Sequence, residues 1–116
     1  MLQGRSLVGF IVATASIAER LEETAMKRHD TDGTNICIHS VCVAPPLRRR
    51  GIALSLLHDL IARLKSQTIL PLPHKVSLIS HAHLMPLYEK AGFVSIGESN
   101  IVHGPEKWFE MQLQLK

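Results

Sequence analysis

The sequence predicts one α/β domain in which two helices pack on a mixed β-sheet. Three observations lead to this fold class. Short apolar segments rich in β-branched residues have the length of strands. Between two of them, the apolar residues from 53 to 64 recur with helical periodicity. The sequence contains no internal repeat. The chain has 116 residues, enough for a single layered core, so we expect one domain over residues 1–116.

The first two predicted strands are apolar segments. Leu7 to Thr14 (LVGFIVAT) is almost continuously apolar, and we expect a strand buried on both faces. Ile36 to Val43 (ICIHSVCV) is the second strand. Strict alternation places Cys37, His39, Val41 and Val43 on one of its faces and Ile38, Ser40 and Cys42 on the other. The two cysteines should therefore point apart and remain unpaired.

The remaining elements follow from helical periodicity and from turn residues. Between the first two strands, Ala18 to His29 is charged and helix-prone, and we expect an exposed excursion. The helix after Gly51 carries apolar residues at Ala53, Leu56, Leu57, Leu60, Ile61 and Leu64. A strand at Lys75 to Ser80 completes a right-handed parallel crossover. We then expect a short helix from Leu84 to Ala91 that ends at Gly92, a strand from Phe93, a turn at His103–Pro105, and a last strand from Lys107 to Gln114.

Charge and hydropathy narrow the possible functions. Thirteen Lys and Arg against ten Asp and Glu leave a net charge of only +3, which does not by itself indicate nucleic acid. The basic residues cluster at Arg48–Arg50, which favours a compact polyanion such as pyrophosphate. No stretch approaches the roughly 18 apolar residues of a membrane span, and no signal-peptide pattern begins the chain. We expect a cytoplasmic protein with neither a membrane nor a nucleic acid partner.

The segment Arg48–Arg49–Arg50–Gly51–Ile52–Ala53 predicts a phosphate-binding turn. A strand, a glycine and a helix N-terminus bring free backbone N–H groups and the positive end of the helix dipole to one point. The segment has no Gly-Lys-Ser/Thr, as nucleotide triphosphatases have, and only one of the glycines of a dinucleotide fingerprint. An ordinary strand-to-helix turn with a solvated basic face would show the same hexapeptide.

Two ordered motifs carry a resemblance to the GNAT superfamily of N-acetyltransferases. Arg48, Gly51 and Ala53 fill the three defining positions of its coenzyme A motif, Gln/Arg-x-x-Gly-x-Gly/Ala. Downstream, LMPLYEKAGF places Tyr88 as in a second signature of the superfamily. The chain is most similar to the arylalkylamine N-acetyltransferases and to related fungal polyamine acetyltransferases. The resemblance implies a GNAT-type, mostly antiparallel sheet with a central parallel strand pair, truncated at its amino terminus.

The same resemblance implies acetyl-coenzyme A as the bound substrate and assigns roles to residues. His39 corresponds to a catalytic histidine and Tyr88 to the tyrosine that protonates the coenzyme A thiolate, for which their ordinary pKa values near 6.5 and 10 are suitable. Cys37 stands where many arylalkylamine enzymes carry a second histidine, so we expect a buried structural thiol there. The cofactor-binding residues would be Val41, Cys42 and Val43 beside the pantetheine arm, and Arg48, Arg49, Arg50, Gly51, Ile52 and Ala53 at the pyrophosphate.

Three functions stay open at this point. The leading one is acetyl transfer to a primary amine, an arylalkylamine or a polyamine. A truncated coenzyme A-binding protein with little activity is the second, since the sequence begins after the strands and helices that form the family's amine site. A small nucleic-acid-binding domain using Arg48–Arg50 is the third. His81, His83 and His103 have no metal-ligand spacing, so we expect no metal. The Leu7–Thr14 strand would be an exposed sheet edge and favours a homodimer or a strand-paired oligomer.

Overall fold

In the computed structural model the described residues are 2–3, 6–16, 29, 33–68, 70–101 and 104–115. Two short strands, β1 (Leu2–Gln3) and β2 (Ser6–Leu7), form a small hairpin. The main sheet has the order β3-β4-β5-β7-β6. Its strands are β3 (Gly9–Ser16), β4 (Asn35–Val43), β5 (Lys75–Ser80), β6 (Val94–Glu98) and β7 (Phe109–Gln114). The helices are α2 (Ile52–Lys65) and α3 (Met85–Ala91), each preceded by a 3₁₀ turn, Pro45–Leu47 and Ala82–Leu84.

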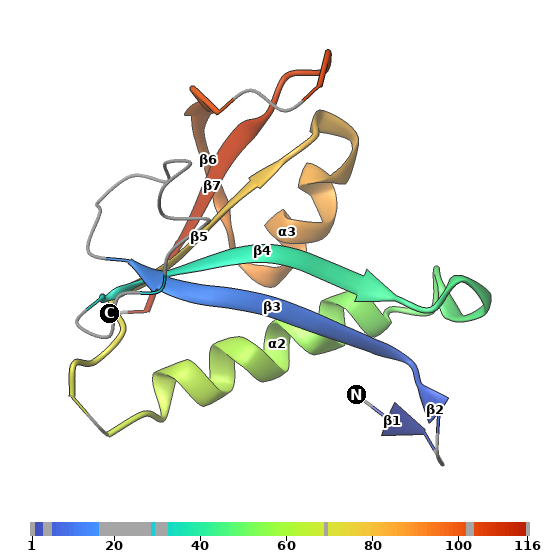
Figure 1. Cartoon of the computed structure of the whole chain (residues 1–116), viewed down its shortest axis with the longest axis horizontal. Helices are drawn as coiled ribbons and strands as arrows, with labels where there is room; N and C mark the ends of the chain where they lie inside the picture. Colours follow the sequence, from blue (N-terminus) through green and yellow to red (C-terminus); the bar gives the residue numbers. More distant parts are fainter. Residues whose placement is uncertain are drawn as a thin grey trace.

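The sheet is mostly antiparallel, with one parallel pair at its centre. β4 and β5 run parallel, whereas the other neighbours in the sheet are antiparallel. Helix α2 connects the parallel pair, and α3 connects β5 to β6 (Figure 1). This arrangement confirms the predicted fold class, including the central parallel pair.

The core lies between the two helices and one face of the sheet. Leu57 of α2 and Val76 of β5 are fully buried there, beside Phe93, which immediately precedes β6. Removing a leucine-sized side chain from water contributes roughly 2 kcal/mol, so a few such contacts decide on which face α2 packs. Gly92 ends α3 in the left-handed conformation, with φ of 106°, and Phe93 N donates to Tyr88 O at 3.0 Å. The predicted stop at Gly92 is therefore confirmed.

The first long strand differs from its prediction. Strand β3 begins at Gly9 and is the end strand of the sheet, with one face against the core. Phe10 and Val12 are 41% and 44% exposed, so the expectation of a strand buried on both faces is wrong. An apolar run does not reveal that a strand lies at an edge, because Phe and Val also suit a half-exposed strand. The predicted exposed excursion at 18–29 lies outside the described residues, apart from His29.

A β-bulge at His39 changes the faces of β4. Val12 opposes Ser40 and Ala13 opposes Ile38, so His39 has no cross-strand partner in the register of β3. Beyond the bulge, Val41 packs on the same core as Ile38, and its predicted place on the face of Cys37 is wrong.

The bulge also brings the two cysteines to one face of the sheet. Cys37 opposes Thr14 and Cys42 opposes Phe10, and Thr14 and Phe10 lie on the same face of β3. The prediction of opposite faces is therefore wrong. Both cysteines are nevertheless free, as expected.

Candidate active site

The parallel strands separate immediately after they meet, which opens a fork in the sheet. Their ladder consists of three residue pairs, from Asn35 opposite Lys75 to Cys37 opposite Ser77. Beyond this point β4 turns toward the N-terminus of α2, and β5 continues beside β7 (Figure 1). Strand β4 therefore has six further residues, from Ile38 to Val43, along which β5 does not pair.

A cavity of about 600 Å³ lies at the end of the β4 arm of this fork. Its walls come from the end of β4, the following turn, the first turn of α2, and α3 with the 3₁₀ turn before it. The lining residues are Val41, Cys42, Val43, Leu47, Arg48, Arg49, Gly51, Ile52, Ala53, Leu54, Leu84 and Leu87. All the predicted cofactor residues except Arg50 are among them. The sequence did not indicate the leucines, because the helical pattern assigned Leu84 and Leu87 to a helix without showing which surface they face.

The main chain of Val41 and Val43 points into the fork. Ala44 N donates to Val8 O at 2.8 Å, and Gly9 opposes Val43. In an antiparallel ladder this register makes Val41 and Val43 non-hydrogen-bonded positions, whose N–H and C=O groups point away from β3. Arg48 Nε donates to Val43 O at 3.3 Å, which is consistent with this direction. The fork thus presents strand-like donors and acceptors to any extended ligand that enters it.

The turn before α2 is shaped to hold an anion. Arg49 and Gly51 both have left-handed backbones, with φ of 65° and 76°. A turn that alternates in this way directs successive N–H groups to one side. Helix α2 has no side-chain cap, and its first backbone acceptor bond runs from Ser55 N to Gly51 O. The N–H groups of its first turn are therefore available to a phosphate, with the helix dipole behind them.

His39 is held by a neighbour that the sequence did not indicate. Its Nε2 lies 2.7 Å from Thr14 Oγ1 on the adjacent strand, so the imidazole and the hydroxyl are hydrogen-bonded. Burial lowers the pKa of His39 from its ordinary value of 6.5, because the charged form loses solvation. The imidazole is therefore neutral at pH 7, which is the state that a general base requires.

Tyr88 lies on α3, where its ring meets Phe93 edge to face, with centroids 6.0 Å apart. Burial raises the pKa of the Tyr88 phenol above 10, and proximity to Cys42 raises it further. The phenol thus keeps its proton at neutral pH and can donate it. Tyr88 does not line the cavity, but it packs against the same core cluster as Val41 of β4 and Leu87 of α3, which do.

Cys37 has the properties of a structural thiol. It is fully buried with Ile101 and Ile79 on the sheet face away from the helices. Burial, reinforced by the Glu110 carboxylate and partly opposed by Lys75, raises the pKa of Cys37 to about 11. At neutral pH the thiol is protonated and a poor nucleophile.

In the part of the chain that the structure describes, His, Cys, Asp and Glu side chains form no group of three that could hold a metal ion. His81 and His83 stack on each other, and His103 lies outside the described residues. None of the described helices is long and apolar enough to cross a membrane.

The fold and the fork are those of an acyltransferase domain that uses acyl-coenzyme A. Comparison with known proteins identifies the family. The family model for the acetyltransferase (GNAT) domain matches residues 6–115. The chain belongs to the GNAT acetyltransferase family. It is 30% identical over 114 residues to the serotonin N-acetyltransferase of Mesocricetus auratus, a match that covers 98% of this chain and 53% of that protein. The chain therefore spans about half the length of this relative.

Solved structures support the same fold. The ribosomal-protein-S18-alanine N-acetyltransferase of Escherichia coli superposes with a TM-score of 0.70 at 19% identity, over 99% of this chain and 66% of that one. Arabidopsis thaliana NAA60 in complex with acetyl-CoA gives a TM-score of 0.69 at 23% identity, over 93% and 66% of the two chains. These likenesses bear on the fold, and the predicted GNAT architecture is confirmed.

Proposed function

We propose that this chain binds acetyl-coenzyme A in the fork of the sheet and transfers the acetyl group to a primary amine. One observation carries the proposal: the cavity at the end of β4 joins strand-like backbone groups at Val41 and Val43 to an uncapped helix N-terminus at Gly51. These features suit the two ends of one ligand, an amide-rich arm and a pyrophosphate. A Cβ built on Gly51 would meet nothing within 4 Å, so the turn leaves room for phosphate oxygens.

The residues around the fork supply the groups that acyl transfer needs. Bound acetyl-coenzyme A would supply the activated thioester. The backbone N–H of Val41 donates a hydrogen bond to the carbonyl oxygen as it gains charge. His39, neutral and fixed by Thr14, accepts the proton of the attacking amine, directly or through water. Tyr88 gives its proton to the departing thiolate. The amine would attack directly, in a ternary complex.

An assay with a panel of amines tests this proposal. The purified chain is incubated with acetyl-coenzyme A and with arylalkylamines, alkyl diamines and polyamines, and release of free thiol is followed. Turnover of at least one class is expected. Stabilisation by coenzyme A without turnover of any amine would overturn catalysis and support the second candidate, a coenzyme A-binding protein with little activity.

The pH dependence should report on His39. The lowered pKa predicts that kcat stays flat near pH 7 and falls only as the pH drops through an inflection below 6.5, where the imidazole gains a proton. His39→Gln should remove this inflection and lower kcat on the order of 100-fold. Thr14→Val should lower kcat by a smaller factor. His58→Gln, at an exposed position of α2, is the matched control and should retain the wild-type profile. An unchanged acidic inflection in His39→Gln would contradict the assignment.

The edge of the sheet supports a proposal of self-association. Among the residues that the structure describes, strand β3 ends the sheet and exposes Phe10 and Val12, and an exposed apolar end strand tends to pair. His29 covers one point of this edge, since its Nδ1 accepts from Ala15 N at 3.0 Å. We expect a dimer by light scattering, which Val12→Lys should shift toward monomer. A wild-type chain that is monomeric at all concentrations would contradict pairing.

A further inference from the structure

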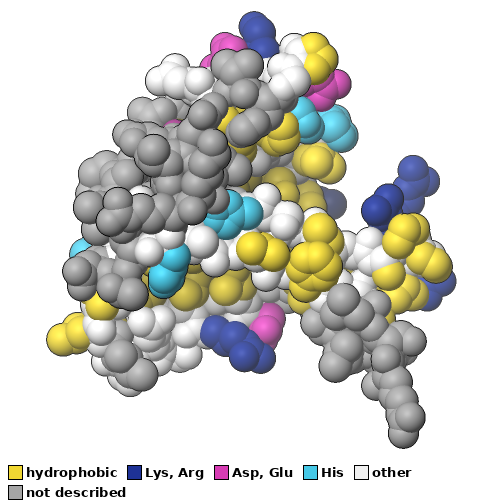
Figure 2. Space-filling model, viewed as in Figure 1, with side chains coloured by type: hydrophobic (Ala, Val, Ile, Leu, Met, Phe, Trp, Pro, Cys, Tyr) yellow, Lys and Arg dark blue, Asp and Glu magenta, His cyan; other side chains and the backbone are white. Residues whose placement is uncertain are grey.

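An aromatic and acidic cluster at the end of the other arm of the fork has no role in the chemistry described so far. His81 follows β5, and its ring packs against Trp108 with centroids 3.8 Å apart and planes tilted by 32°. The Glu106 carboxylate lies 3.2 Å from His81, measured from Oε2 to Nδ1. Figure 2 shows histidine and acidic side chains gathered at this end of the molecule, where a basic side chain also lies, and further Lys and Arg side chains at the end of β4. We call His81, Glu106 and Trp108 the β5-end cluster.

The β5-end cluster lies on the same face of the sheet as His39. Cys37 and Ser77 are neighbours in the parallel ladder, and Cys37 packs with Ile79. Alternation along β5 puts His81 on the face of Ser77 and Ile79. On β4, His39 bonds to Thr14, which opposes Cys37 and shares its face. The proposed base and the β5-end cluster therefore face the same side from opposite arms of the fork.

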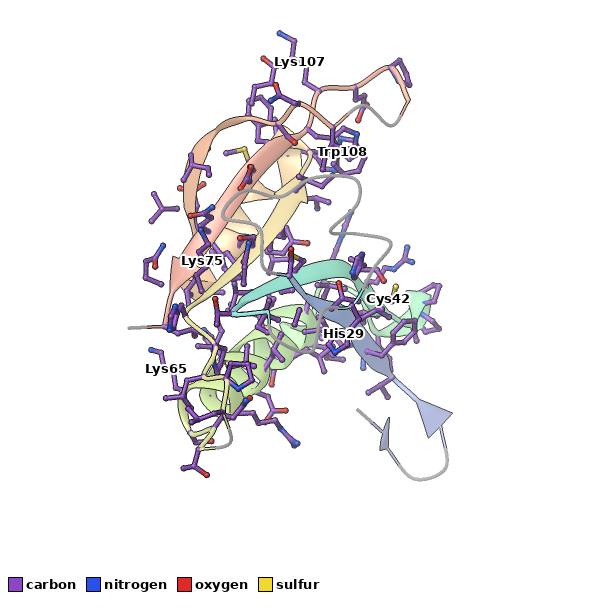
Figure 3. All side chains as sticks on the ribbon, turned by 60° about the vertical axis from the view of Figure 1, so that its left-hand side comes forward. His29, Cys42, Lys65, Lys75, Lys107 and Trp108 are labelled. Carbon is purple, nitrogen blue, oxygen red and sulfur yellow. The ribbon has the colours of Figure 1, made fainter. Side chains whose placement is uncertain are left out.

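The topology also gives the scale of their separation. At about 3.3 Å per residue, His39 lies roughly 7 Å and His81 roughly 13 Å beyond the last paired residues of their strands. Because the strands diverge, the backbone positions of His39 and His81 are on the order of 10 Å apart, and the side chains at the two places take up part of this gap. In Figure 3 the labelled Trp108 lies on the side of the β5 arm and the labelled Cys42 on the β4 arm. An extended alkyl chain spans such a gap, whereas the amine that reacts at His39 would not itself reach the cluster.

The charge of Glu106 is available to a cation in solution. Its side chain is 67% exposed, and although His81 Nδ1 is close, the two make no hydrogen bond. The neighbouring cation in the sequence, Lys107, lies 4.0 Å from Glu98 instead. A carboxylate beside an indole attracts an ammonium group through its charge and through the aromatic face.

We propose that the β5-end cluster binds a second ammonium group of the acceptor, so that the amine acetylated by this chain is an alkyl diamine or polyamine. This inference rests on the proposed acetyl transfer and names its substrate class. One ammonium pairs with Glu106 beside Trp108, and the alkyl chain crosses the fork. The other nitrogen, deprotonated, then reaches the reacting carbonyl near His39. An arylalkylamine with a single nitrogen would leave the carboxylate with only the His81 ring beside it.

The test compares putrescine with butylamine, which has the same alkyl chain and one amine, and with phenethylamine. Wild type should have the highest kcat/KM for putrescine. Glu106→Gln should lower the ratio of kcat/KM for putrescine to that for butylamine about fivefold, the effect of one partly exposed charge pair. Glu98→Gln, a second exposed glutamate whose partner is Lys107, is the matched control and should keep the wild-type ratio. An equal ratio in wild type and Glu106→Gln, or a preference for phenethylamine, would overturn the inference while leaving acetyl transfer intact.

A binding experiment separates the two proposals if no amine is turned over. Putrescine is titrated calorimetrically into the chain saturated with coenzyme A. Binding that weakens in Glu106→Gln but not in Glu98→Gln would support the second-ammonium site and overturn catalysis. Absence of putrescine binding together with absence of turnover would overturn both.

Discussion

A Gly51→Val variant is expected to lose affinity for coenzyme A by about thirtyfold, the effect of removing a charge-assisted contact to phosphate. Gly51 has φ of 76°, where a β-branched residue is strained by about 1–2 kcal/mol. Its missing side chain faces open space at the wall of the cavity, so a valine would occupy the volume that phosphate oxygens need. Isothermal titration with coenzyme A measures the loss.

Two further variants separate backbone strain from loss of the ligand space. Gly104 has nearly the same φ, 79°, and a Cβ there also meets nothing within 4 Å, but it does not line the cavity. Gly104→Val should therefore show a comparable loss of stability with coenzyme A affinity close to wild type. Gly51→Asn tolerates the left-handed backbone and should lie between wild type and Gly51→Val. Wild-type affinity in Gly51→Val would refute the phosphate-binding role of this turn.

Local sequence patterns were sufficient to predict the positions of the helices and of most strands. The predicted strand Lys75–Ser80 is the observed β5, and α2 begins directly after Gly51 and contains all the predicted apolar positions from Ala53 to Leu64. Both predictions depend on hydrophobic periodicity and on the proline and glycine residues that bound the elements, and both signals can be seen directly in the sequence. The exposure of Phe10 could not be predicted in this way, because it depends on which strand ends the sheet.

The geometry of the fork could not be predicted from the sequence. Strict alternation along Ile36–Val43 assigned Val41 to the wrong face, since nothing in the local sequence marks His39 as the extra residue of a bulge. The hydrogen bond between Thr14 and His39 joins residues 25 positions apart and depends on the same register. Motif resemblance nevertheless indicated most residues that line the cavity, because the turn from Arg48 to Ala53 is contiguous in sequence. Long-range pairing, not local propensity, places the base.

Tyr88→Phe is expected to lower kcat on the order of 100-fold while leaving coenzyme A affinity within about twofold, because only the proton donor is removed. The phenyl ring can keep the contact with Phe93, so the free energy of unfolding should change by less than about 1 kcal/mol. The raised pKa of Tyr88 predicts that wild-type activity persists to pH values above 10 before the phenol ionises and activity falls. Single-turnover thiol release by wild type and Tyr88→Phe across this pH range measures the loss of activity in the variant and the pH dependence of the wild type. A variant with wild-type kcat would show that the thiolate takes its proton from another donor, such as solvent.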